Sequence, residues 1–226
     1  MQLPKLAIFD MDGLLFDTER VLMEENAKVM AEHGYTQNYD EYVQTIGTAD
    51  EEFFSRLYEI HGADYPAEEI AETSRIREIE RMKREGVPVK PGIPELLAFF
   101  RERDIPCCVA TSTIRSDATA LLDLAGILDA FAFVVTSEEV AQSKPNPDIF
   151  LLACERGDTS PEDSIVFEDS QNGVLAAFRA GIPVICIPDI KQPEPYYAEK
   201  ATKVVRSALD VPALFDLHLI ACEKSE

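Results

Sequence analysis

The segment Leu6 to Asp17, LAIFDMDGLLFD, decides the fold of this chain. It begins with the apolar run Leu6 to Phe9, which has the length of one buried strand. Asp10 and Asp12 follow directly, so two carboxylates leave the end of that strand together. Because open α/β sheets bind ligands beyond the carboxyl ends of their strands, we expect both carboxylates to face a binding site.

Two neighbouring carboxylates repel each other unless a cation or a shared proton lies between them. The pair Asp10 and Asp12 therefore predicts a metal site, a general acid/base pair, or both. The alternative is an ordinary turn, since Asp-x-Asp-Gly also suits turns. A calcium-binding loop is not supported, because its later acidic residues and closing Glu do not follow at the required spacing.

The composition narrows the class of protein and of partner. A chain of 226 residues fits one large domain, or a core with a smaller insertion. With 42 acidic and 21 basic residues the net charge is −21. Such a charge disfavours nucleic acid and anionic membrane surfaces as partners, but it leaves a small phosphorylated substrate open. The oligomeric state is not predicted, and a monomer is compatible with the composition.

The five cysteines form no Cys-x-x-Cys pair and are odd in number. They are Cys107, Cys108, Cys154, Cys186 and Cys222. We expect reduced, buried thiols in a cytoplasmic protein. The first strand begins close to Met1, which leaves no room for a signal peptide, and no apolar run has the length of a membrane span.

Residues 18–88 differ from the rest of the chain in the spacing of their apolar residues. Apolar residues recur at helical spacing in three segments between Val21 and Arg84. We therefore expect a small helical domain at residues 18–88, inserted into a larger domain made of residues 1–17 and 89–226. The basic residues of the last helical segment are expected to lie mostly on a solvated face; they are Arg75, Arg77, Arg81 and Lys83.

From residue 91 onward, predicted helices and strands alternate. Strands are expected at 106–110, 131–136, 164–167 and 183–187, with an edge strand at 203–205. Helices are expected at 93–103, 116–125, 147–157, 171–180 and 211–220. Such alternation produces parallel strands with right-handed crossovers. The predicted fold is therefore α/β, a doubly wound parallel sheet with a helical insertion after its first strand.

Four predicted strands are each followed by side chains that can perform chemistry. In chain order these are Asp10 and Asp12, Thr111 and Ser112, Lys144, and Glu168 and Asp169. Taken singly, the hydroxyls suit helix caps, the lysine a solvated surface and the acids turns. The carboxyl ends of parallel strands meet at one edge of a sheet, so we interpret these side chains as one site.

Four motifs carry a resemblance to a known family. They are DMDGLLFDTE (Asp10 to Glu19), TS (Thr111-Ser112), KPNPDIF (Lys144 to Phe150) and FEDSQNG (Phe167 to Gly173). With these motifs the chain resembles the haloacid dehalogenase superfamily, and within it the β-phosphoglucomutase-like branch. The resemblance covers nearly the whole chain and implies a Rossmann-like core with a helical cap. The motifs are specific for the superfamily and much less specific for the substrate.

The resemblance implies phosphoryl transfer. Asp10 would be the nucleophile that attacks phosphorus and forms an aspartyl-phosphate. Asp12 would be the general acid/base, which protonates the leaving oxygen and then activates water. Family dehalogenases generally lack this second Asp, so Asp12 favours phosphoryl transfer over dehalogenation.

The resemblance also implies Mg²⁺ as the cofactor. The ion would bridge Asp10 and the phosphoryl group, with the Asp12 backbone carbonyl and Asp169 as further ligands. Glu168 would be a ligand or an outer partner. A cation is needed because a carboxylate must approach a phosphate of like charge.

The phosphoryl group itself would be bound by three residues according to the same resemblance. Thr111 would donate its hydroxyl, Ser112 its backbone N–H, and Lys144 would pair with both the phosphoryl group and Asp10. Groups of this kind stabilise the charge that is spread over the transferring oxygens.

We therefore expect a Mg²⁺-dependent phosphatase of a small phosphorylated metabolite, with sugar phosphates as one class. A phosphosugar mutase is the alternative. Family mutases use a His in the first cap helix and an Arg after a cap Gly, but these positions fall here on Leu22 and near Asp50, after Gly47. A non-catalytic phosphate-binding module is a third hypothesis. A phosphonate-cleaving enzyme would need a cap lysine, and Lys28 is expected to face solvent.

Overall fold

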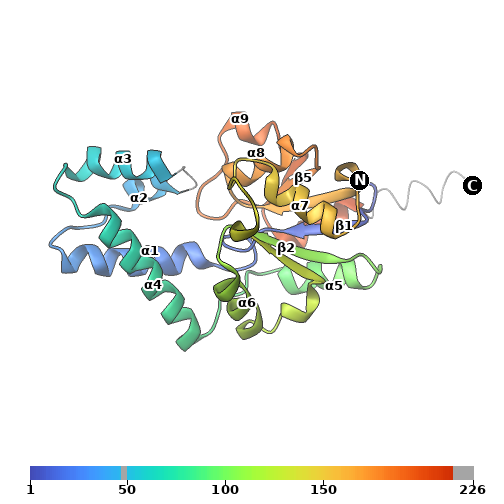
Figure 1. The fold of residues 1–226 in the computed structure, drawn as a ribbon, viewed down its shortest axis with the longest axis horizontal. Coiled ribbons are helices and arrows are strands. Elements are labelled where there is room, and N and C mark those ends of the chain that lie inside the picture. Colours follow the sequence, from blue (N-terminus) through green and yellow to red (C-terminus); the bar gives the residue numbers. More distant parts are fainter. Residues whose placement is uncertain (47–49, 216–226) are drawn as a thin grey trace, which may run out of the picture.

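The computed structural model describes residues 1–46 and 50–215, and its described strands form one six-stranded parallel sheet (Figure 1). The strands are β1 (Leu6–Phe9), β2 (Cys107–Thr111), β3 (Phe133–Thr136), β4 (Ser164–Glu168), β5 (Val184–Cys186) and β6 (Lys203–Val204). Their order in the sheet is β3-β2-β1-β4-β5-β6. This order and the parallel pairing confirm the predicted doubly wound α/β fold, with β6 at the edge.

The described helices agree closely with the predicted segments, with two additions, α2 and the short α9. They are α1 (Thr18–Glu32), α2 (Tyr39–Thr45), α3 (Asp50–His61), α4 (Ala67–Glu85), α5 (Ile93–Arg101), α6 (Arg115–Leu124), α7 (Asp148–Arg156), α8 (Gln171–Arg179) and α9 (Pro195–Ala198). Short 3₁₀ turns are η1 (Leu128–Ala130), η2 (Ser137–Glu139), η3 (Pro161–Asp163) and η4 (Ala208–Asp210). Of the helix predicted at 211–220, residues 211–215 are helical, and the others lie outside the described residues.

Helix α2 was not predicted, because its sequence YDEYVQT has little apolar periodicity. Its beginning is fixed instead by Asn38, whose side chain accepts hydrogen bonds from the backbone N–H groups of Asp40 and Glu41. An Asn at this position satisfies N–H groups that have no partner within the helix. Local capping, rather than a hydrophobic stripe, therefore specifies this helix.

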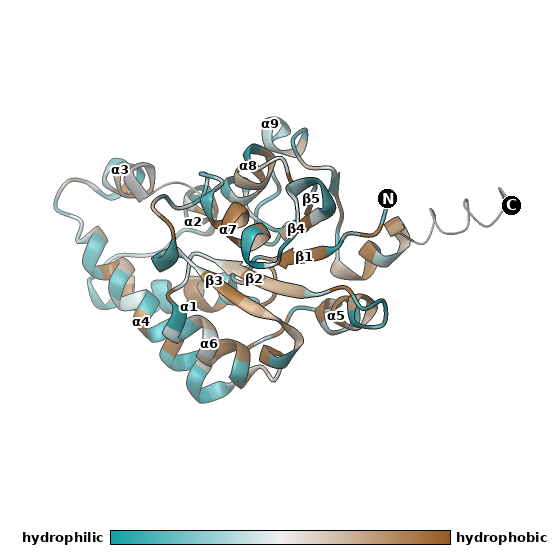
Figure 2. Cartoon of the chain, turned by 45° about the vertical axis from the view of Figure 1, so that its right-hand side comes forward, coloured by the Kyte–Doolittle hydropathy of each residue, from teal (hydrophilic) through white to brown (hydrophobic). Residues whose placement is uncertain are grey.

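Strand β1 lies at the centre of the sheet and is fully buried. Successive side chains of a strand face opposite sides. Ala7 and Phe9 accordingly belong to the apolar cluster that includes residues of α5 and α6, whereas Leu6 and Ile8 belong to the cluster with α7 and α8. Strand β1 is brown in Figure 2, which marks its residues as hydrophobic, and all of them are buried, as expected for a parallel sheet covered by helices.

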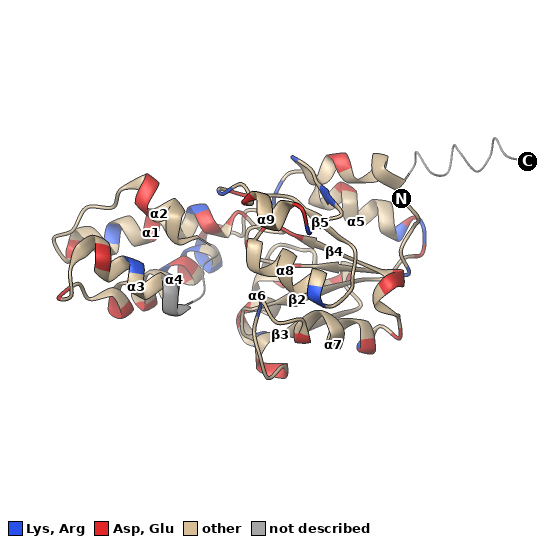
Figure 3. Cartoon of the chain, turned by 90° about the horizontal axis from the view of Figure 1, so that it is seen from above, with Lys and Arg blue, Asp and Glu red and all other residues tan. Residues whose placement is uncertain are grey.

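Helices α1 to α4 lie to one side of the sheet and pack mainly on each other (Figure 1). They have their own apolar cluster, which includes Val29, Met30, Tyr65 and Ile70. Figure 3 shows red and blue residues spread over these helices, which fits the predicted solvated faces. The exact division into two domains stays a prediction.

Two chain segments connect these helices to the sheet and lie side by side. The Asp17 N–H donates to the Pro88 carbonyl at 2.9 Å, and the Lys90 N–H donates to the Leu15 carbonyl at 2.8 Å. Phe16 also forms a bridge with Val89. The segment between β1 and α1 and the segment that returns from α4 therefore restrain each other.

The four described cysteines, Cys107, Cys108, Cys154 and Cys186, are buried and free, as predicted; Cys222 lies outside the described residues. Burial raises the pKa of the Cys107 and Cys186 thiols to about 12, which keeps both protonated. Among the described helices, none has both the length and the apolar character needed to cross a membrane.

Candidate active site

Three residues that follow or end different strands come together: Asp10 after β1, Lys144 beyond β3 and Glu168 at the end of β4. Lys144 lies in the chain beyond β3, and its Nζ donates to Asp10 Oδ1, to Glu168 Oε1 at 2.8 Å and to the carbonyl of Ala110 at 3.2 Å. All three ammonium protons are therefore used. The lysine side chain is only 7% exposed, so it is held in one place between two carboxylates.

Burial determines the electrostatics of these groups. Desolvation raises the pKa of Asp10 to about 8, with the Glu168 and Asp12 charges adding to it and Lys144 opposing it. Desolvation also opposes the charge of Lys144, but Asp10 and Glu168 raise its pKa overall. The pKa of Asp169 lies well above its usual range because of burial and the nearby charges of Glu168 and Asp10. A further positive charge at this site would thus be favoured.

The carboxylates of Asp10, Glu168 and Asp169 offer oxygens that all lie within 4.8 Å of one another. Hard oxygen ligands at this spacing fit Mg²⁺. The Asp12 carboxylate is not part of this cluster among the described residues; its predicted contribution was the backbone carbonyl, and that contribution stays a prediction.

The carboxylates of Glu168 and Asp169 differ in the number of hydrogen bonds that they accept from the protein. Glu168 Oε1 accepts from Lys144, and its Oε2 accepts from the backbone N–H and the hydroxyl of Ser170, both at 2.9 Å. Within the part of the chain that the structure describes, the Asp169 carboxylate accepts no hydrogen bond. Asp169 is therefore the better placed of the two for direct metal binding, and Glu168 for holding Lys144.

Two glycines make this close packing of carboxylates possible. A Cβ on Gly13 would lie 2.2 Å from Asp169 Oδ2, and Gly13 has a φ of +79°. A Cβ on Gly173 would lie 1.7 Å from Glu168 Oε1. Any larger residue at either position would displace an acidic side chain of the site, and at Gly13 it would also be strained.

The side chain of Asp12 has a different partner. Its Oδ2 accepts a hydrogen bond of 2.6 Å from the hydroxyl of Thr113, and Thr113 Oγ1 in turn accepts one of 3.0 Å from Arg75 Nη2. Arg75 belongs to α4, whereas Thr113 follows β2. Desolvation opposes the charge of Arg75, but the carboxylates of Asp12, Glu78 and Glu19 raise its pKa overall.

Thr111 and Ser112 lie next to these groups at the end of β2. Thr111 is buried, and its Oγ1 accepts from the N–H of Thr113 at 3.0 Å, which leaves its own proton available as a donor. The Ser112 carbonyl accepts from the Ser137 hydroxyl at 2.7 Å, while its N–H has no acceptor among the described residues. Both groups are thus available to oxygens of a ligand.

A cavity of about 320 Å³ lies between helices α1, α2, α3 and α4. Its lining combines apolar, hydroxyl, amide and charged side chains; it comprises Glu19, Leu22, Asn26, Tyr42, Thr45, Ile46, Phe53, Ala71, Ser74 and Arg75. Because Arg75 also contacts Thr113, the cavity is linked directly to the environment of Asp12. Removal from water, with the charges of Asp12 and Asp189, raises the pKa of Glu19 to about 7.

The residues that the sequence singled out are therefore close in space, but their roles stay predictions. The sequence did not identify Thr113, which looks like an ordinary cap residue, or Lys90, whose Nζ donates to the Gly13 carbonyl and to Asp189, both at 2.6 Å. Arg75 was grouped with solvated basic residues; its side chain is indeed 44% exposed, but its contact with Thr113 was not predicted. Lys28 is exposed and paired with Glu25, as expected for a lysine that faces solvent.

Comparison with known proteins places these features in one family. The model of the family described as "Haloacid dehalogenase-like hydrolase" matches residues 7–187 of this chain. The chain is 32% identical to a phosphorylated carbohydrates phosphatase of Thermotoga maritima, over 97% of this chain and 94% of that protein. It is also 32% identical to a mitochondrial (DL)-glycerol-3-phosphatase of Arabidopsis thaliana, over 93% and 75% respectively. The crystal structure of β-phosphoglucomutase from Clostridium difficile shares the fold, with a TM-score of 0.72 at 20% identity and coverage of 96% and 100%.

Proposed function

The chain belongs to the haloacid dehalogenase-like hydrolase family and is a phosphoric monoester hydrolase, and we propose that it acts on a small phosphorylated metabolite through a phosphorylated Asp10. One observation supports Asp10 as the nucleophile most directly. Lys144 binds only one carboxylate oxygen of Asp10, Oδ1, and this leaves the other oxygen for attack on phosphorus.

In the proposed reaction, Asp10 attacks phosphorus and the ester P–O bond breaks. The leaving oxygen takes the proton of Asp12. Water then attacks the same phosphorus and gives a proton back to Asp12, while the bond between Asp10 and phosphorus breaks. Phosphate is released and both carboxyl groups return to their starting state.

We propose that Lys144, Thr111 and Ser112 bind the oxygens of the transferring phosphoryl group. The longest contact of Lys144, at 3.2 Å to the Ala110 carbonyl, is the one that a phosphoryl oxygen would replace. The lysine stays held by its two carboxylate partners and loses little motion when a phosphate arrives, and preorganised donors are the main source of stabilisation in such reactions. The Thr111 hydroxyl and the Ser112 N–H add donors from the neighbouring strand end.

Asp10 and Asp169 are the residues proposed to hold Mg²⁺, with the backbone carbonyl of Asp12. Support comes from the spacing of the carboxylate oxygens and from the Asp169 carboxylate, which no described donor occupies. When bound, the ion neutralises the like charges of a carboxylate and a phosphate. Glu168, whose oxygens are both used by Lys144 and Ser170, is proposed to act by holding Lys144.

We propose that helices α1 to α4 act as a cap that selects the leaving group. The cavity of about 320 Å³ combines hydroxyl and amide groups with apolar surfaces, which suits a hydroxyl-bearing carbon skeleton such as a sugar or polyol. Arg75 provides a positive charge there, and Glu19 provides a negative one. A second phosphate would need more positive charge, so monophosphates are expected to be preferred over bisphosphates.

Release of phosphate from sugar and polyol monophosphates, with and without Mg²⁺, tests this function. We expect metal-dependent release from monophosphates and much less from bisphosphates. Asp10→Asn should remain folded and release none, because it removes the nucleophile with little change in volume. Isomerised sugar phosphate without free phosphate, or normal turnover by Asp10→Asn, would contradict the proposal.

A thermal-shift titration with Mg²⁺ tests the metal site without relying on turnover. The wild type should be stabilised by Mg²⁺, because a ligand that binds the folded state raises its stability. Asp169→Asn should lose this response. An equal response in both proteins would remove Asp169 from the metal site.

A further inference from the structure

The hydrogen bonds around Asp12 form a chain with a fixed direction. A guanidinium only donates, so Arg75 must donate to Thr113 Oγ1. A hydroxyl has one proton, and the geometry directs the proton of Thr113 to Asp12 Oδ2. Asp12 Oδ2 is therefore an acceptor, and a proton carried by Asp12 for transfer lies on its other oxygen, Oδ1.

Thr113 has little freedom to change this arrangement. It is 5% exposed, and its own N–H donates to Thr111 Oγ1 at 3.0 Å. The residue is thus tied at its backbone to the strand end that is proposed to bind phosphate, and at its side chain to the proposed acid/base. The hydroxyl of Thr113 is the single described side-chain donor to the Asp12 carboxylate.

Arg75 brings the helices α1 to α4 into this chain. It projects from α4, and its Nη1 lies 3.5 Å from Oε2 of Glu78 on the same helix. It also lines the cavity that is proposed to receive the leaving group. Helix α4 packs along α1. A change in the position of α4 would therefore move the donor that orients Thr113.

We propose that Thr113 and Arg75 are positioning residues that orient Asp12 for proton transfer to the leaving oxygen. Thr113 fixes one carboxylate oxygen, and Arg75 fixes the direction of the Thr113 hydroxyl while coupling it to α4. The inference rests on the proposed phosphatase function and deepens it. It explains why a neutral hydroxyl, rather than a lysine, contacts Asp12: the group must be oriented while its other oxygen stays free to exchange a proton.

The dependence on leaving group tests this role. A strongly basic alkoxide leaving group needs a proton from Asp12, whereas p-nitrophenolate leaves without one. The kinetic constant to compare is kcat/KM, because it covers the steps up to departure of the leaving group and not the later hydrolysis. Substrates are therefore an alkyl phosphate that the wild type hydrolyses and p-nitrophenyl phosphate.

Thr113→Val keeps the shape of the side chain and removes the hydroxyl. We expect it to lower kcat/KM for the alkyl phosphate about 10- to 100-fold, since Asp12 loses a hydrogen bond that becomes stronger as Asp12 gives up its proton and becomes charged. For p-nitrophenyl phosphate the loss should stay below about threefold, because no proton is needed. Thr113→Ser should recover most of the activity.

Arg75→Met should show the same dependence on leaving group with a smaller loss. If both residues act through one chain, the double variant Thr113→Val/Arg75→Met should be no slower than Thr113→Val alone. Arg77→Met, which removes a neighbouring arginine of α4 that pairs with Glu32, is the matched control and should leave kcat/KM unchanged. Equal losses on both substrates, or additive losses in the double variant, would overturn the inference.

Crystal structures of the wild type and Thr113→Val supply a readout that does not depend on activity. We expect one ordered Asp12 side chain in the wild type and a different or mixed orientation in the variant. An unchanged Asp12 in Thr113→Val would overturn the positioning role even if no ester were hydrolysed. Absence of hydrolysis by the wild type would instead contradict the proposed function.

Discussion

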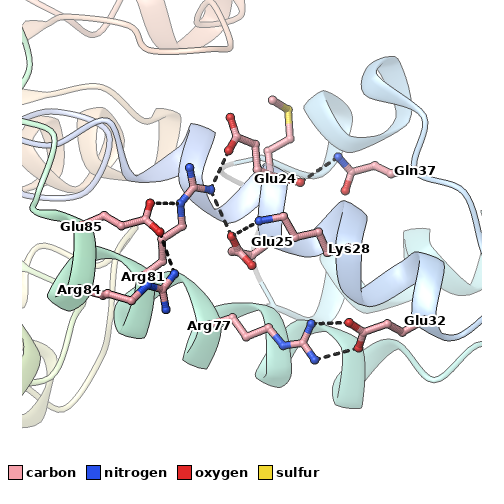
Figure 4. A network of polar contacts seen from close by, with 10 residues as sticks. Glu24, Glu25, Lys28, Glu32, Gln37, Arg77, Arg81, Arg84 and Glu85 are labelled. Carbon is pink, nitrogen blue, oxygen red and sulfur yellow. Dashed lines mark hydrogen bonds and ion pairs between the residues drawn. The ribbon is translucent and has the colours of Figure 1, made fainter.

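Two groups of ion pairs in this protein use the same residue types at very different exposure. At the sheet edge, Lys144 lies between Asp10 and Glu168, and the side chains are 7%, 9% and 1% exposed. Between α1 and α4, Arg77 pairs with Glu32 and Arg81 with Glu24 at the surface, although Arg81 also contacts the buried Glu25 (Figure 4). There, Arg77 is 35% exposed and its partner Glu32 is 55% exposed.

The difference in exposure predicts that removing one partner costs more stability in the buried group than at the surface. Removal of one partner from a buried pair leaves a charge without compensation, whereas an exposed charge is solvated by water. The surface pairs join two helices, but the buried pairs fix a proposed nucleophile. The following variants test whether depth, rather than the number of ion pairs, governs stability and activity.

The largest effect is expected for Lys144→Met. The change leaves Asp10 and Glu168 buried without their cation and should lower the free energy of unfolding by about 3–5 kcal/mol above a pH of about 8, where Asp10 is ionised in the wild type. Activity should fall at least about 100-fold, because a donor to the transferring group is lost. Urea denaturation and phosphate release on the same preparation measure both effects.

Lys5→Met is the exposed control for this variant, because Lys5 makes a short ion pair with Asp163 at 2.8 Å but is 73% exposed. Its stability and turnover should be close to those of the wild type. The destabilisation of Lys144→Met should become smaller as the pH falls below about 8, since the pKa of Asp10, about 8 with Lys144 present, rises further without it and lets that carboxyl take up a proton. Equal destabilisation by the two substitutions would refute the dependence on depth.

The buried group was predictable from the sequence for a physical reason. Asp10, Lys144 and Glu168 each follow a predicted strand, and parallel topology requires the strand ends to meet. The short strand LAIF and the motif spacing were therefore enough to place them. Contacts between α4 and the sheet edge do not follow from any local period, since they depend on how the helices are oriented.

Arg75 and Arg77 show this limit most clearly. They are two residues apart on the same helix, and helix periodicity alone assigns neither to the site. In the structure Arg75 reaches Thr113, whereas Arg77 pairs with Glu32 of α1. Likewise, Thr113 was not distinguishable from a helix cap until Asp12 was found beside it.

An intermediate effect is expected for Glu139→Gln. This residue is 25% exposed; its Oε1 accepts from Arg156 at 2.6 Å, and its Oε2 accepts from Arg115 and from the Thr136 N–H. Desolvation opposes its charge, but Arg156, the Thr136 N–H and Arg115 together lower the pKa of Glu139 to about 2. Allowing for solvent screening, the substitution should lower the free energy of unfolding at neutral pH by about 1–2 kcal/mol.

The pH dependence of this variant has a definite sign. Because the pKa of Glu139 is lower in the folded than in the unfolded state, its stabilisation is complete above the unfolded pKa, which is about 4.5. It decreases as the pH falls from there towards about 2. Denaturation of wild type and Glu139→Gln across this range should show converging stabilities, and a constant difference would show that the charge is not responsible.

The smallest effect is expected for Arg77→Met. Arg77 makes a bidentate pair with Glu32, at 2.7 and 2.8 Å, and this geometry favours a measurable contribution. Both side chains are partly exposed to solvent, however, and exposed charges are screened by salt. The destabilisation should therefore be smaller than for Glu139→Gln and should vanish at about 1 M salt, where the Debye length is about 3 Å. Paired denaturation curves at low and high salt measure it. A salt-independent loss as large as that of Glu139→Gln would mean that Arg77 stabilises the contact between α1 and α4 through the packing of its side-chain stem, and exposure would then not be the property that ranks these ion pairs.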